Sequence, residues 1–250
     1  MSDRVFSITD IGTKRDYNQD AYTIQVARTC IGDMYMCVVC DGVGGLNKGE
    51  IASASVVTAF SDWFKNRLPD FLDNPSDLFN RVHTSWEILI SELNAKLRAY
   101  GQQQNLHMGT TVSALFVAGD KALVLQVGDS RVYQYRQNKL CYRTKDQTLA
   151  QREFDAGNIS YEQLLTDKRA HVLLQCVGSS ARLSAEYSMV DCYKNDTFIV
   201  CSDGFYRHLS NDDMVMLSKA DASRKTLQLL VNLVKSRKET DNITSVFMRV

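Results

Sequence analysis

Apolar and polar positions alternate along the first part of the chain, as they do in half-buried β-strands. A polar turn, GTKRDYNQD, separates the first two of these segments, and the third contains the apolar run MYMCVVC. This pattern predicts a start rich in hairpins. The three expected strands span residues 4–9, 21–27 and 33–40.

Helical spacing replaces the alternation after the third strand. Apolar residues recur every three or four positions over residues 49–68 and again over residues 78–97. This spacing is typical of two long amphipathic helices. The turn between them contains the only two prolines of the chain, Pro69 and Pro75.

Strand patterns return in four consecutive segments joined by short turns such as AGD and RQNK, which predicts an antiparallel meander. A stretch that mixes short helical patterns with polar residues follows, and then a strand, a helix and a final strand. The four meander strands span residues 111–117, 122–127, 131–135 and 139–143, the mixed stretch 146–175, and the last three elements 197–201, 222–235 and 244–249.

This order of elements favours an α+β sandwich over a strictly alternating parallel fold. No Ser/Gly-rich linker, low-complexity tract or internal repeat interrupts the pattern, so we expect one domain over residues 1–250.

Composition and charge narrow the function classes. Hydrophobic residues make up 44% of the chain and charged residues 23%, as in a globular protein with a substantial core. Lys plus Arg equals Asp plus Glu at 29 each, which leaves no basic field to attract nucleic acid. The first ten residues lack signal-peptide features, and no run reaches the roughly 18 apolar residues of a membrane-spanning helix. We therefore expect a cytoplasmic protein without a nucleic-acid partner or membrane insertion.

The seven cysteines are scattered through apolar segments, which indicates buried reduced thiols rather than a disulfide scaffold. Cys37 and Cys40 form a C-x-x-C motif in a predicted strand. Because residues i and i+3 of a strand point to opposite faces, these two sulfurs should not share a metal ion.

Aspartates stand where predicted buried strands end. Asp41 follows CVVC, Asp129 follows LVLQVG and Asp203 follows FIVCS, while Asp20 ends the first polar turn and Asp241 lies just before the last strand. Each alone could be a turn former, because its side chain can bond nearby backbone amides. Several carboxylates converging at one edge would repel each other unless cations or protons neutralised them.

Oxygen ligands suit hard cations such as Mg2+ and Mn2+, whereas zinc favours histidine and cysteine. Two such ions can lower the pKa of a bound water, orient it for in-line attack and stabilise the oxygens of a phosphoryl group. Arg15, five residues before Asp20, offers a fork of donors that matches phosphate oxygens. It is the candidate phosphate clamp, although a solvated surface arginine is the alternative, since most arginines are exposed.

The order of these motifs resembles the PPM family of metal-dependent protein phosphatases, also called the PP2C family, and in particular its compact bacterial members. The resemblance runs from end to end of the chain. It implies two central antiparallel sheets flanked by helices, an αββα sandwich, with a metal centre at one edge. The matching segments are TDIGTKRDYNQDAY (9–22), VVCDGVGG (38–45), GTT (109–111), VGDSRVY (127–133), CSDGFYRHL (201–209) and TDNIT (240–244).

Carried over position by position, the resemblance implies a core of two Mn2+ or Mg2+ ions. Asp41 would bridge them, Asp20 and the carbonyl of Gly42 would complete one ion site, and Asp203 and Asp241 the other. Through the water that the ions activate, these four aspartates would be the catalytic residues.

A third, weaker ion would lie between Asp129 and Asp203. Arg15 matches the phosphate-binding arginine of the family.

The chain departs from the family pattern at two positions. Val43 stands where some relatives carry a histidine that serves as general acid, and Gln147 replaces the histidine of an Asp-His-Ser segment. Proton donation and substrate contacts at these positions are therefore unassigned. His208 follows Asp203 by five residues, but we interpret it as a helix-start or surface residue.

The implied activity is hydrolysis of phosphoserine and phosphothreonine in proteins, opposing a Ser/Thr kinase in bacterial signalling. The expected partners are phosphoproteins, including such a kinase or its targets, and we expect a monomer. Residues 146–175 resemble the flap beside the active site of bacterial relatives. We hypothesise that its charges help select substrates, namely Arg152, Glu153, Asp155, Lys168 and Arg169.

Two alternatives stay open. A catalytically weak member of the fold could be a regulatory or phosphoprotein-binding protein, since fold alone does not fix function. The complete set of aspartates favours an enzyme instead. Metal-dependent hydrolysis of a small phosphoester or of a nucleic-acid backbone uses the same chemistry, and the zero net charge disfavours nucleic acid.

Overall fold

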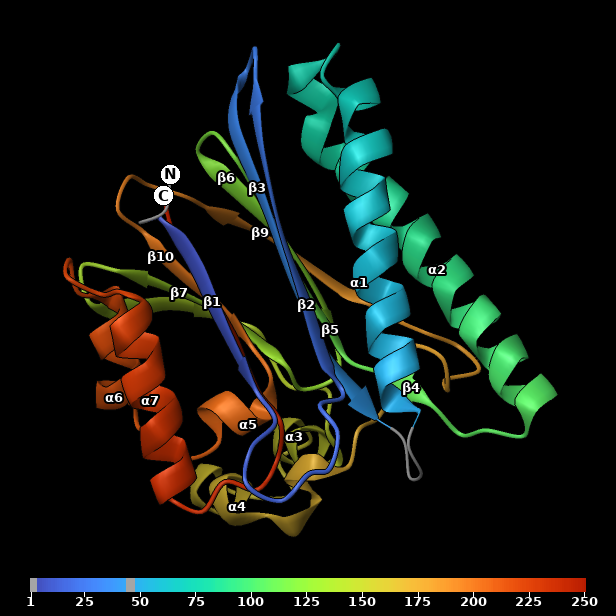
Figure 1. Ribbon diagram of the computed structural model, residues 1–250, viewed down its shortest axis with the longest axis vertical. Coiled ribbons are helices and arrows are strands. Elements are labelled where there is room, and N and C mark those ends of the chain that lie inside the picture. Colours follow the sequence, from blue (N-terminus) through green and yellow to red (C-terminus); the bar gives the residue numbers. More distant parts are fainter. Residues whose placement is uncertain (1–3, 44–47) are drawn as a thin grey trace.

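The computed structural model describes residues 4–43 and 48–250. Two antiparallel sheets lie against each other at its centre, and helices cover the outer face of each sheet (Figure 1). The predicted α+β fold with two central sheets flanked by helices is therefore confirmed. Among the described residues, no helix combines the length and the apolar character needed to cross a membrane.

The first sheet has five strands in the order β1, β11, β10, β7, β8. Its second strand, β11, pairs with β1 on one side and with β10 on the other, so the two ends of the chain lie in the same sheet (Figure 1). The bounds are β1 (Val5–Asp10), β7 (Arg131–Arg136), β8 (Lys139–Arg143), β10 (Thr197–Cys201) and β11 (Ile243–Arg249).

The second sheet runs in the order β2, β3, β5, β6, β9, and the short strand β4 pairs with the end of β3. Of the start rich in hairpins predicted from the sequence, only the β2–β3 hairpin forms, and it is the first pair of this sheet. The expected pairing across the first polar turn is wrong, because β1 pairs with β11 in the other sheet. The bounds are β2 (Asp20–Thr29), β3 (Gly32–Val43), β4 (Gly109–Thr110), β5 (Val112–Ala118), β6 (Lys121–Val127) and β9 (Glu186–Asp191).

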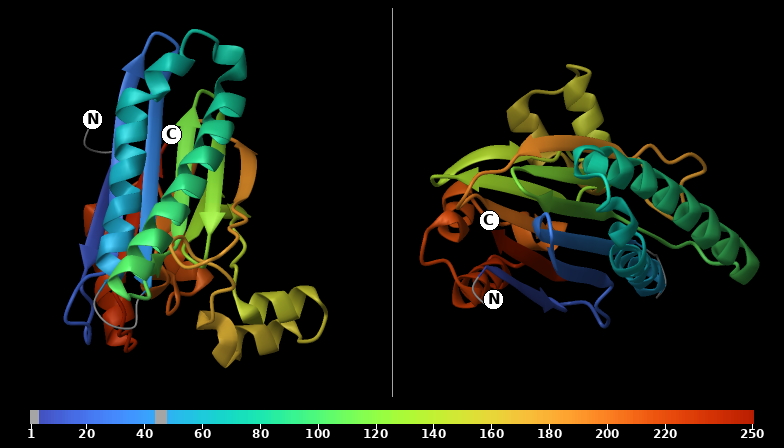
Figure 2. Two further views of the ribbon diagram at one scale, coloured as in Figure 1. Left: turned by 90° about the vertical axis from the view of Figure 1, so that its right-hand side faces the viewer. Right: turned by 90° about the horizontal axis from the view of Figure 1, so that it is seen from above.

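The two long helices α1 and α2 pack on the second sheet, and α5, α6 and α7 pack on the first (Figure 2). The helices α3 and α4 lie instead at one end of the molecule. The bounds are α1 (Gly49–Asn66), α2 (Leu78–Gln104), α3 (Leu149–Asp155), α4 (Tyr161–Thr166), α5 (Asp203–Tyr206), α6 (Asn211–Val215) and α7 (Arg224–Ser236), with 3-10 turns at η1 (Leu68–Phe71), η2 (Pro75–Asp77), η3 (Lys168–His171) and η4 (Met216–Ser218).

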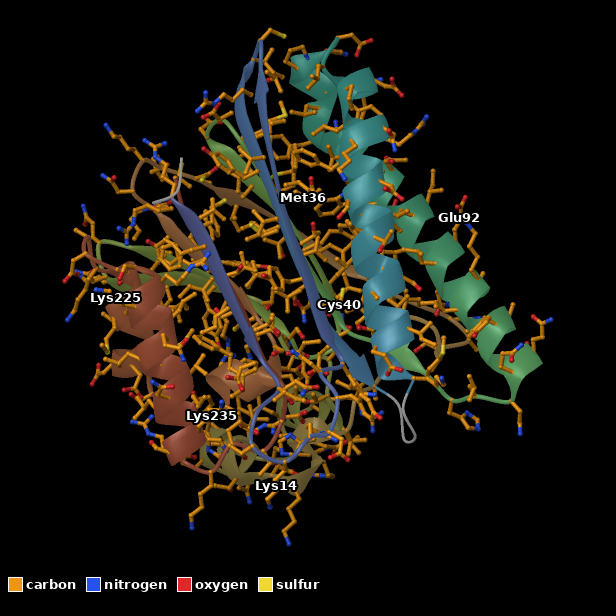
Figure 3. All side chains as sticks on the ribbon, viewed as in Figure 1. Lys14, Met36, Cys40, Glu92, Lys225 and Lys235 are labelled. Carbon is orange, nitrogen blue, oxygen red and sulfur yellow. The ribbon has the colours of Figure 1, made fainter. Side chains whose placement is uncertain are left out.

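The core has three layers, one between the sheets and one beneath each set of helices. Cys37 faces the layer between the sheets, whereas Met36 and Cys40 face the helices α1 and α2 (Figure 3). The two sulfurs of the C-x-x-C motif thus lie on opposite faces of β3, as predicted. All seven cysteines are free thiols, and five of them are buried.

The predicted four-stranded meander is wrong. β5 and β6 pair in the second sheet, and β7 and β8 pair in the first, so the chain changes sheets between β6 and β7. Gly128 makes this crossing with a positive φ of +93°, and a Cβ there would lie 2.6 Å from a side-chain carbon of Thr111. Only glycine tolerates such a conformation and approach at this point. The crossing carries Asp129 to the edge where strands of both sheets end.

Candidate metal centre and active site

The strand ends of both sheets meet at one end of the sandwich and bring the five aspartates together. Asp20 of β2 lies directly opposite Asp41 of β3 in the strand register. Asp203 follows β10 and begins α5, and Asp241 lies two residues before β11. Asp129 lies on the crossing between the sheets. The sequence placed Asp41, Asp129 and Asp203 at strand ends, and the resemblance to the family implied that all five aspartates meet at one edge.

A cavity of about 680 Å³ opens among these residues. Asp20 does not line it, and its Oδ2 accepts a hydrogen bond from Ser202 Oγ at 2.8 Å. The other residues expected at the site all line the cavity, namely Arg15, Asp41, Gly42, Asp129, Asp203 and Asp241. Gly44 and Gly45 of the VVCDGVGG motif lie outside the described residues.

Burial and mutual repulsion make these carboxylates costly to ionise. Burial, reinforced by Asp203 and Asp241, raises the pKa of Asp20 to about 7. Burial together with the neighbouring carboxylates raises the pKa of Asp41 well above its usual value, and the same causes act on Asp129. Among the described residues, Oδ1 of Asp20 and Oδ1 of Asp203 are buried without a hydrogen-bond partner. Buried carboxylate oxygens that are anionic and lack hydrogen-bond partners are suitable ligands for a hard divalent cation.

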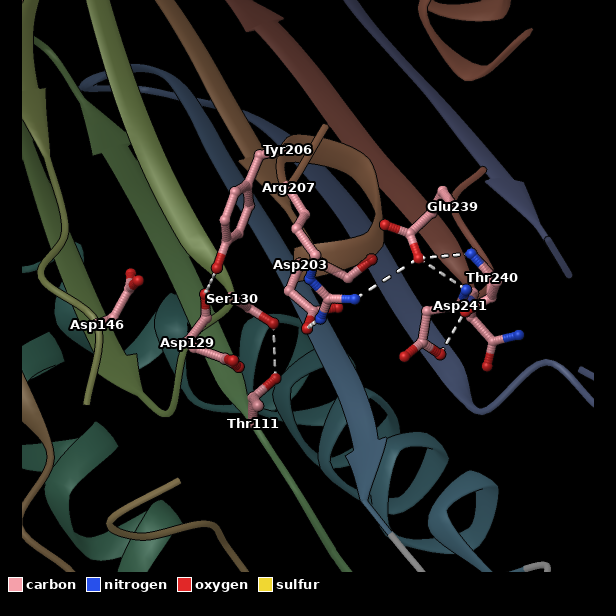
Figure 4. Close-up of polar contacts among 12 residues, drawn as sticks. Thr111, Asp129, Ser130, Asp146, Asp203, Tyr206, Arg207, Glu239, Thr240 and Asp241 are labelled. Atoms are coloured by element: carbon pink, nitrogen blue, oxygen red, sulfur yellow. Dashed lines mark hydrogen bonds and ion pairs between the residues drawn. The ribbon is translucent and has the colours of Figure 1, made fainter. Parts of the chain in front are cut away.

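Two arginines neutralise part of this charge. Arg15 donates from Nε and Nη2 to the two carboxylate oxygens of Asp241, at 2.9 and 2.8 Å. Arg207 pairs with Asp203, and its Nη1 lies 3.6 Å from Oε1 of the buried Glu239 (Figure 4). Glu239 in turn accepts hydrogen bonds from the backbone N–H groups of Thr240 and Asp241. Sequence reasoning missed Arg207 and Glu239, because nothing in their local patterns separates them from surface charges.

Within residues 4–43 and 48–250, no group of three or more Asp, Glu, His or Cys side chains is arranged so that it could hold a metal ion. At two of the carboxylates, the guanidinium groups of Arg15 and Arg207 face oxygens that a cation would need. The donor chemistry fits a cation, but Arg15 must leave Asp241 before both oxygens of that side chain are free.

A pair of buried hydroxyls positions the backbone of Asp41. Thr111 Oγ1 accepts a hydrogen bond from the N–H of Asp41 at 2.9 Å and lies 2.7 Å from Ser130 Oγ (Figure 4). Thr111 also packs against the Gly128 crossing, so one residue connects the β3 end with the loop that bears Asp129. The sequence marked Thr111 only as part of the GTT motif.

Gln147 is a support for the crossing loop. Its Oε1 accepts hydrogen bonds from the N–H of Gly128 at 2.9 Å and from Gln175 Nε2 at 2.8 Å, and its side chain is buried. Its backbone N–H donates to the carbonyl of Gly128 at 2.9 Å. Gln147 does not line the cavity, so this departure from the family pattern acts on the placement of Asp129.

Asn242 fixes the turn that carries Arg15. Its Oδ1 accepts a hydrogen bond from the N–H of Gln19 at 2.8 Å, and its Nδ2 donates to the carbonyls of Ile11 and Tyr17 at 2.9 and 3.1 Å. Asn242 is buried beside Asp241. Asn242, which fixes the turn of the candidate phosphate clamp Arg15, is therefore the sequence neighbour of the candidate metal ligand Asp241.

Two of the four histidines lie near the site, one on the cavity wall and one beside it. His171 of η3 lines the cavity, which the sequence did not indicate, whereas His208 does not. His208 is partly exposed, and its Nε2 lies 3.5 Å from Oε2 of Glu239. Val43 lines the cavity as well, and its side chain has no proton to donate.

Comparison with known proteins supports the family resemblance found in the sequence. A family profile described as protein phosphatase 2C matches residues 13–243. The serine/threonine phosphatase stp of Listeria welshimeri is 28% identical over 240 residues, which make up 94% of this chain and 91% of the relative. The protein phosphatase PhpP of Streptococcus pneumoniae is 26% identical over 243 residues, which make up 95% of this chain and 93% of the relative.

Solved structures share the fold. A serine/threonine phosphatase of S. agalactiae superposes with a TM-score of 0.84 at 28% identity over 98% of both chains. The catalytic domain of the phosphatase PstP, in complex with 2 manganese ions, superposes with a TM-score of 0.78 at 24% identity over 98% of this chain and 97% of that one. Since the family profile spans nearly the whole sequence, the chain belongs to the protein phosphatase 2C family.

Proposed function

We propose that this protein is a metal-dependent protein serine/threonine phosphatase, which hydrolyses phosphoserine and phosphothreonine in other proteins. The proposal rests chiefly on one observation. In a chain of the protein phosphatase 2C family, Arg15 and four of the five aspartates expected for this chemistry line one cavity. Relatives that bear the name serine/threonine phosphatase support the same substrate class.

We propose Mn2+ or Mg2+ as the cofactor, and the manganese complex of PstP supports this choice. When bound, the ions supply the charge that activates water and stabilises the phosphoryl oxygens. Two core ions and a third, weaker one are the number we propose. The residues that would hold them are Asp20, Asp41, Gly42 through its carbonyl, Asp129, Asp203 and Asp241.

Arg15 would bind the phosphate of the substrate. Its guanidinium lies on the cavity wall, and its Nε and Nη2 already bind two carboxylate oxygens in the bidentate geometry that also suits a phosphate. The pair with Asp241 is partly exposed, with side-chain exposures of 52% and 23%. An ion pair of this kind contributes little stability, so Arg15 can change partner at small cost.

The supporting residues would keep the carboxylates in place while Arg15 moves. The backbone of Asp41 is bound by Thr111 and that of Asp129 by Tyr206, whose Oη donates to the Asp129 carbonyl at 2.9 Å. Arg207 and Glu239 remain paired beside Asp203. His171 is the histidine on the cavity wall and is our candidate to hold or donate a proton near the leaving oxygen.

The partners would be phosphoproteins, including a Ser/Thr kinase or its targets. A regulatory or phosphoprotein-binding role is the second reading, and the same experiment separates the two.

The test is hydrolysis of p-nitrophenyl phosphate and of phosphothreonine and phosphotyrosine peptides by metal-free protein, with and without added Mn2+ or Mg2+. We expect metal-dependent turnover of the phosphothreonine peptide, abolished in Asp41→Asn and retained in the matched control Asp33→Asn. Asp33 is an exposed residue of the β2–β3 hairpin. Metal binding by calorimetry without turnover of any substrate would instead contradict the enzymatic function and favour the regulatory role.

A further inference from the structure

A second cavity of about 600 Å³ opens beside the first. Asp129, His171 and Arg207 line both cavities, so the two share a wall. The second cavity lies between α4 and η3 on one side and β7, β8, α5 and α6 on the other. Figure 2 shows α3, α4 and η3 projecting from this end of the sandwich. A chain segment bound in the first cavity can therefore continue into the second.

Large apolar side chains from separate elements gather on the outer wall of this second cavity. Leu140 of β8 is 45% exposed, and Tyr161 and Leu165 of α4 are 54% and 67% exposed. The opposite wall includes the half-buried side chain of Tyr206 and the buried side chain of Met214. Exposed apolar side chains that cluster in a concave surface indicate an interaction site more often than isolated exposed ones do.

The charges of residues 146–175 are mostly neutralised by partners within this segment or directly beside it. Arg152 pairs with Glu153 at 3.4 Å, and Arg169 pairs with Asp167 at 2.6 Å. Asp155 pairs with Lys145 at 2.6 Å. Four of the five charged residues that the sequence suggested for substrate selection are thus already paired with neighbours. The exposed apolar side chains, rather than unpaired charges, are therefore the main feature that this segment offers to a substrate.

We propose that the second cavity binds a large apolar side chain of the phosphoprotein substrate, close in sequence to the phosphorylated serine or threonine. The inference rests on the proposed function, because the first cavity must take the phosphorylated residue. A spherical cavity of this volume is roughly 10 Å across, which an extended chain spans in about three residues. The selected side chain should therefore lie within about three positions of the phosphorylated residue. Lys168, which also lines the cavity, can bury its aliphatic stem against that side chain.

The test compares phosphothreonine peptides that carry one leucine at successive positions on either side of the phosphothreonine in an alanine background. We expect kcat/KM of the wild-type enzyme to be about tenfold higher for the best leucine peptide than for the all-alanine peptide, the size expected for burying one apolar side chain. In the double variant Tyr161→Ala, Leu165→Ala, the ratio between the two peptides should fall to within about twofold. The ratio is measured within one variant, so a general loss of activity does not affect it.

The matched control is Leu229→Ala, since Leu229 is 51% exposed on α7 and does not line either cavity. This variant should keep the full tenfold ratio. A wild-type enzyme that turns over the phosphothreonine peptides but shows no leucine preference at any position overturns the inference and leaves the proposed function standing. The inference is equally wrong if the double variant keeps the wild-type ratio. Absence of turnover on every phosphoester, with metal bound, refutes the proposed function and this inference together.

Discussion

Arg15 and Asp241, 226 positions apart in the chain, bind each other through two hydrogen bonds, Nε to Oδ1 at 2.9 Å and Nη2 to Oδ2 at 2.8 Å. Arg15 is the residue that we expect to hold phosphate, and Asp241 is one that we expect to hold a metal ion. In this pair, Arg15 binds Asp241 where a metal ion would bind it, and Asp241 binds Arg15 where the substrate phosphate would bind it. Binding of the cation and binding of the substrate should both depend on opening this pair.

Arg15→Ala should separate these two roles. Loss of the charged donors should lower kcat/KM for a phosphothreonine peptide about tenfold to a hundredfold, since a hydrogen bond to a charged group contributes about 1.5–3 kcal/mol. Metal affinity should stay the same or rise, because Asp241 no longer has a competing cation. Steady-state kinetics and calorimetric titration with Mn2+ measure the two effects.

The control for Arg15 is Arg28→Ala, which removes an exposed arginine at the far end of β2. It should change neither quantity. A clear drop in metal affinity in Arg15→Ala, with unchanged kcat/KM, would show that the arginine organises the metal ligands and does not bind phosphate.

The two histidines near the site should differ in their effect on turnover. His171→Asn should lower kcat on an alkyl phosphoester by about tenfold to a hundredfold and much less on an aryl phosphoester, whose leaving group needs no proton. His208→Ala should leave both rates nearly unchanged, because His208 does not line the first cavity, where the aspartates lie, and contacts Glu239. Parallel kinetics on the two classes of ester provide the measurement. A large, alkyl-selective loss in His208→Ala would reverse the assignment.

Most elements of the fold could be predicted because their apolar patterns are strong. The buried strand β10 was predicted with its observed bounds, and the long helix α1 is observed over Gly49–Asn66. β9 was missed because it is a partly exposed strand that pairs with β6 through a non-local contact. The short helices α5 and α6 were missed because four or five residues do not show a helical period. The false meander came from assuming that neighbouring strands pair, which the Gly128 crossing prevents.

The site followed from strand ends more than from the spacing of its residues. Asp41 and Asp203 were predicted because a buried strand precedes each of them. Arg207, Glu239 and His171 were not, because their roles arise only when α5, the segment before β11 and η3 meet at the cavity. A sequence pattern predicts where the backbone turns. It does not indicate which charges from distant parts of the chain the residues of that turn will face.

Asn242→Ala tests whether the turn that carries Arg15 depends on one side chain. The change removes three hydrogen bonds and leaves the N–H of Gln19 and the carbonyls of Ile11 and Tyr17 without their partner. We expect a loss of about 1–3 kcal/mol in the free energy of unfolding, the cost of unsatisfied buried polar groups. KM for phosphopeptide should also rise, because Arg15 is less well placed. Chemical denaturation and kinetics measure both, and Asn232→Ala on the exposed face of α7 is the control. Wild-type stability in Asn242→Ala would show that this turn holds its shape by other means.

Asp196 should make the stability of the protein depend on pH at the acidic end. Burial alone opposes its ionisation, but hydrogen bonds from Arg136, the N–H of Tyr193 and Gln134 outweigh burial and lower the pKa of Asp196 below its usual value. Arg136 donates to both carboxylate oxygens at 2.9 and 2.8 Å, and Asp196 is 1% exposed.

Because the folded-state pKa of Asp196 lies below the unfolded one, its contribution is complete above the unfolded value of about 3.9 and is lost as the pH falls through the folded value. Asp196→Asn should therefore cost about 1.5–3 kcal/mol at neutral pH, the range for hydrogen bonds to a charged group. The difference from wild type should shrink below about pH 4. Urea unfolding across this pH range measures the difference, with Asp191→Asn, at an exposed residue of β9, as the control. A difference that stays constant down to the lowest pH would mean that the carboxylate charge does not contribute.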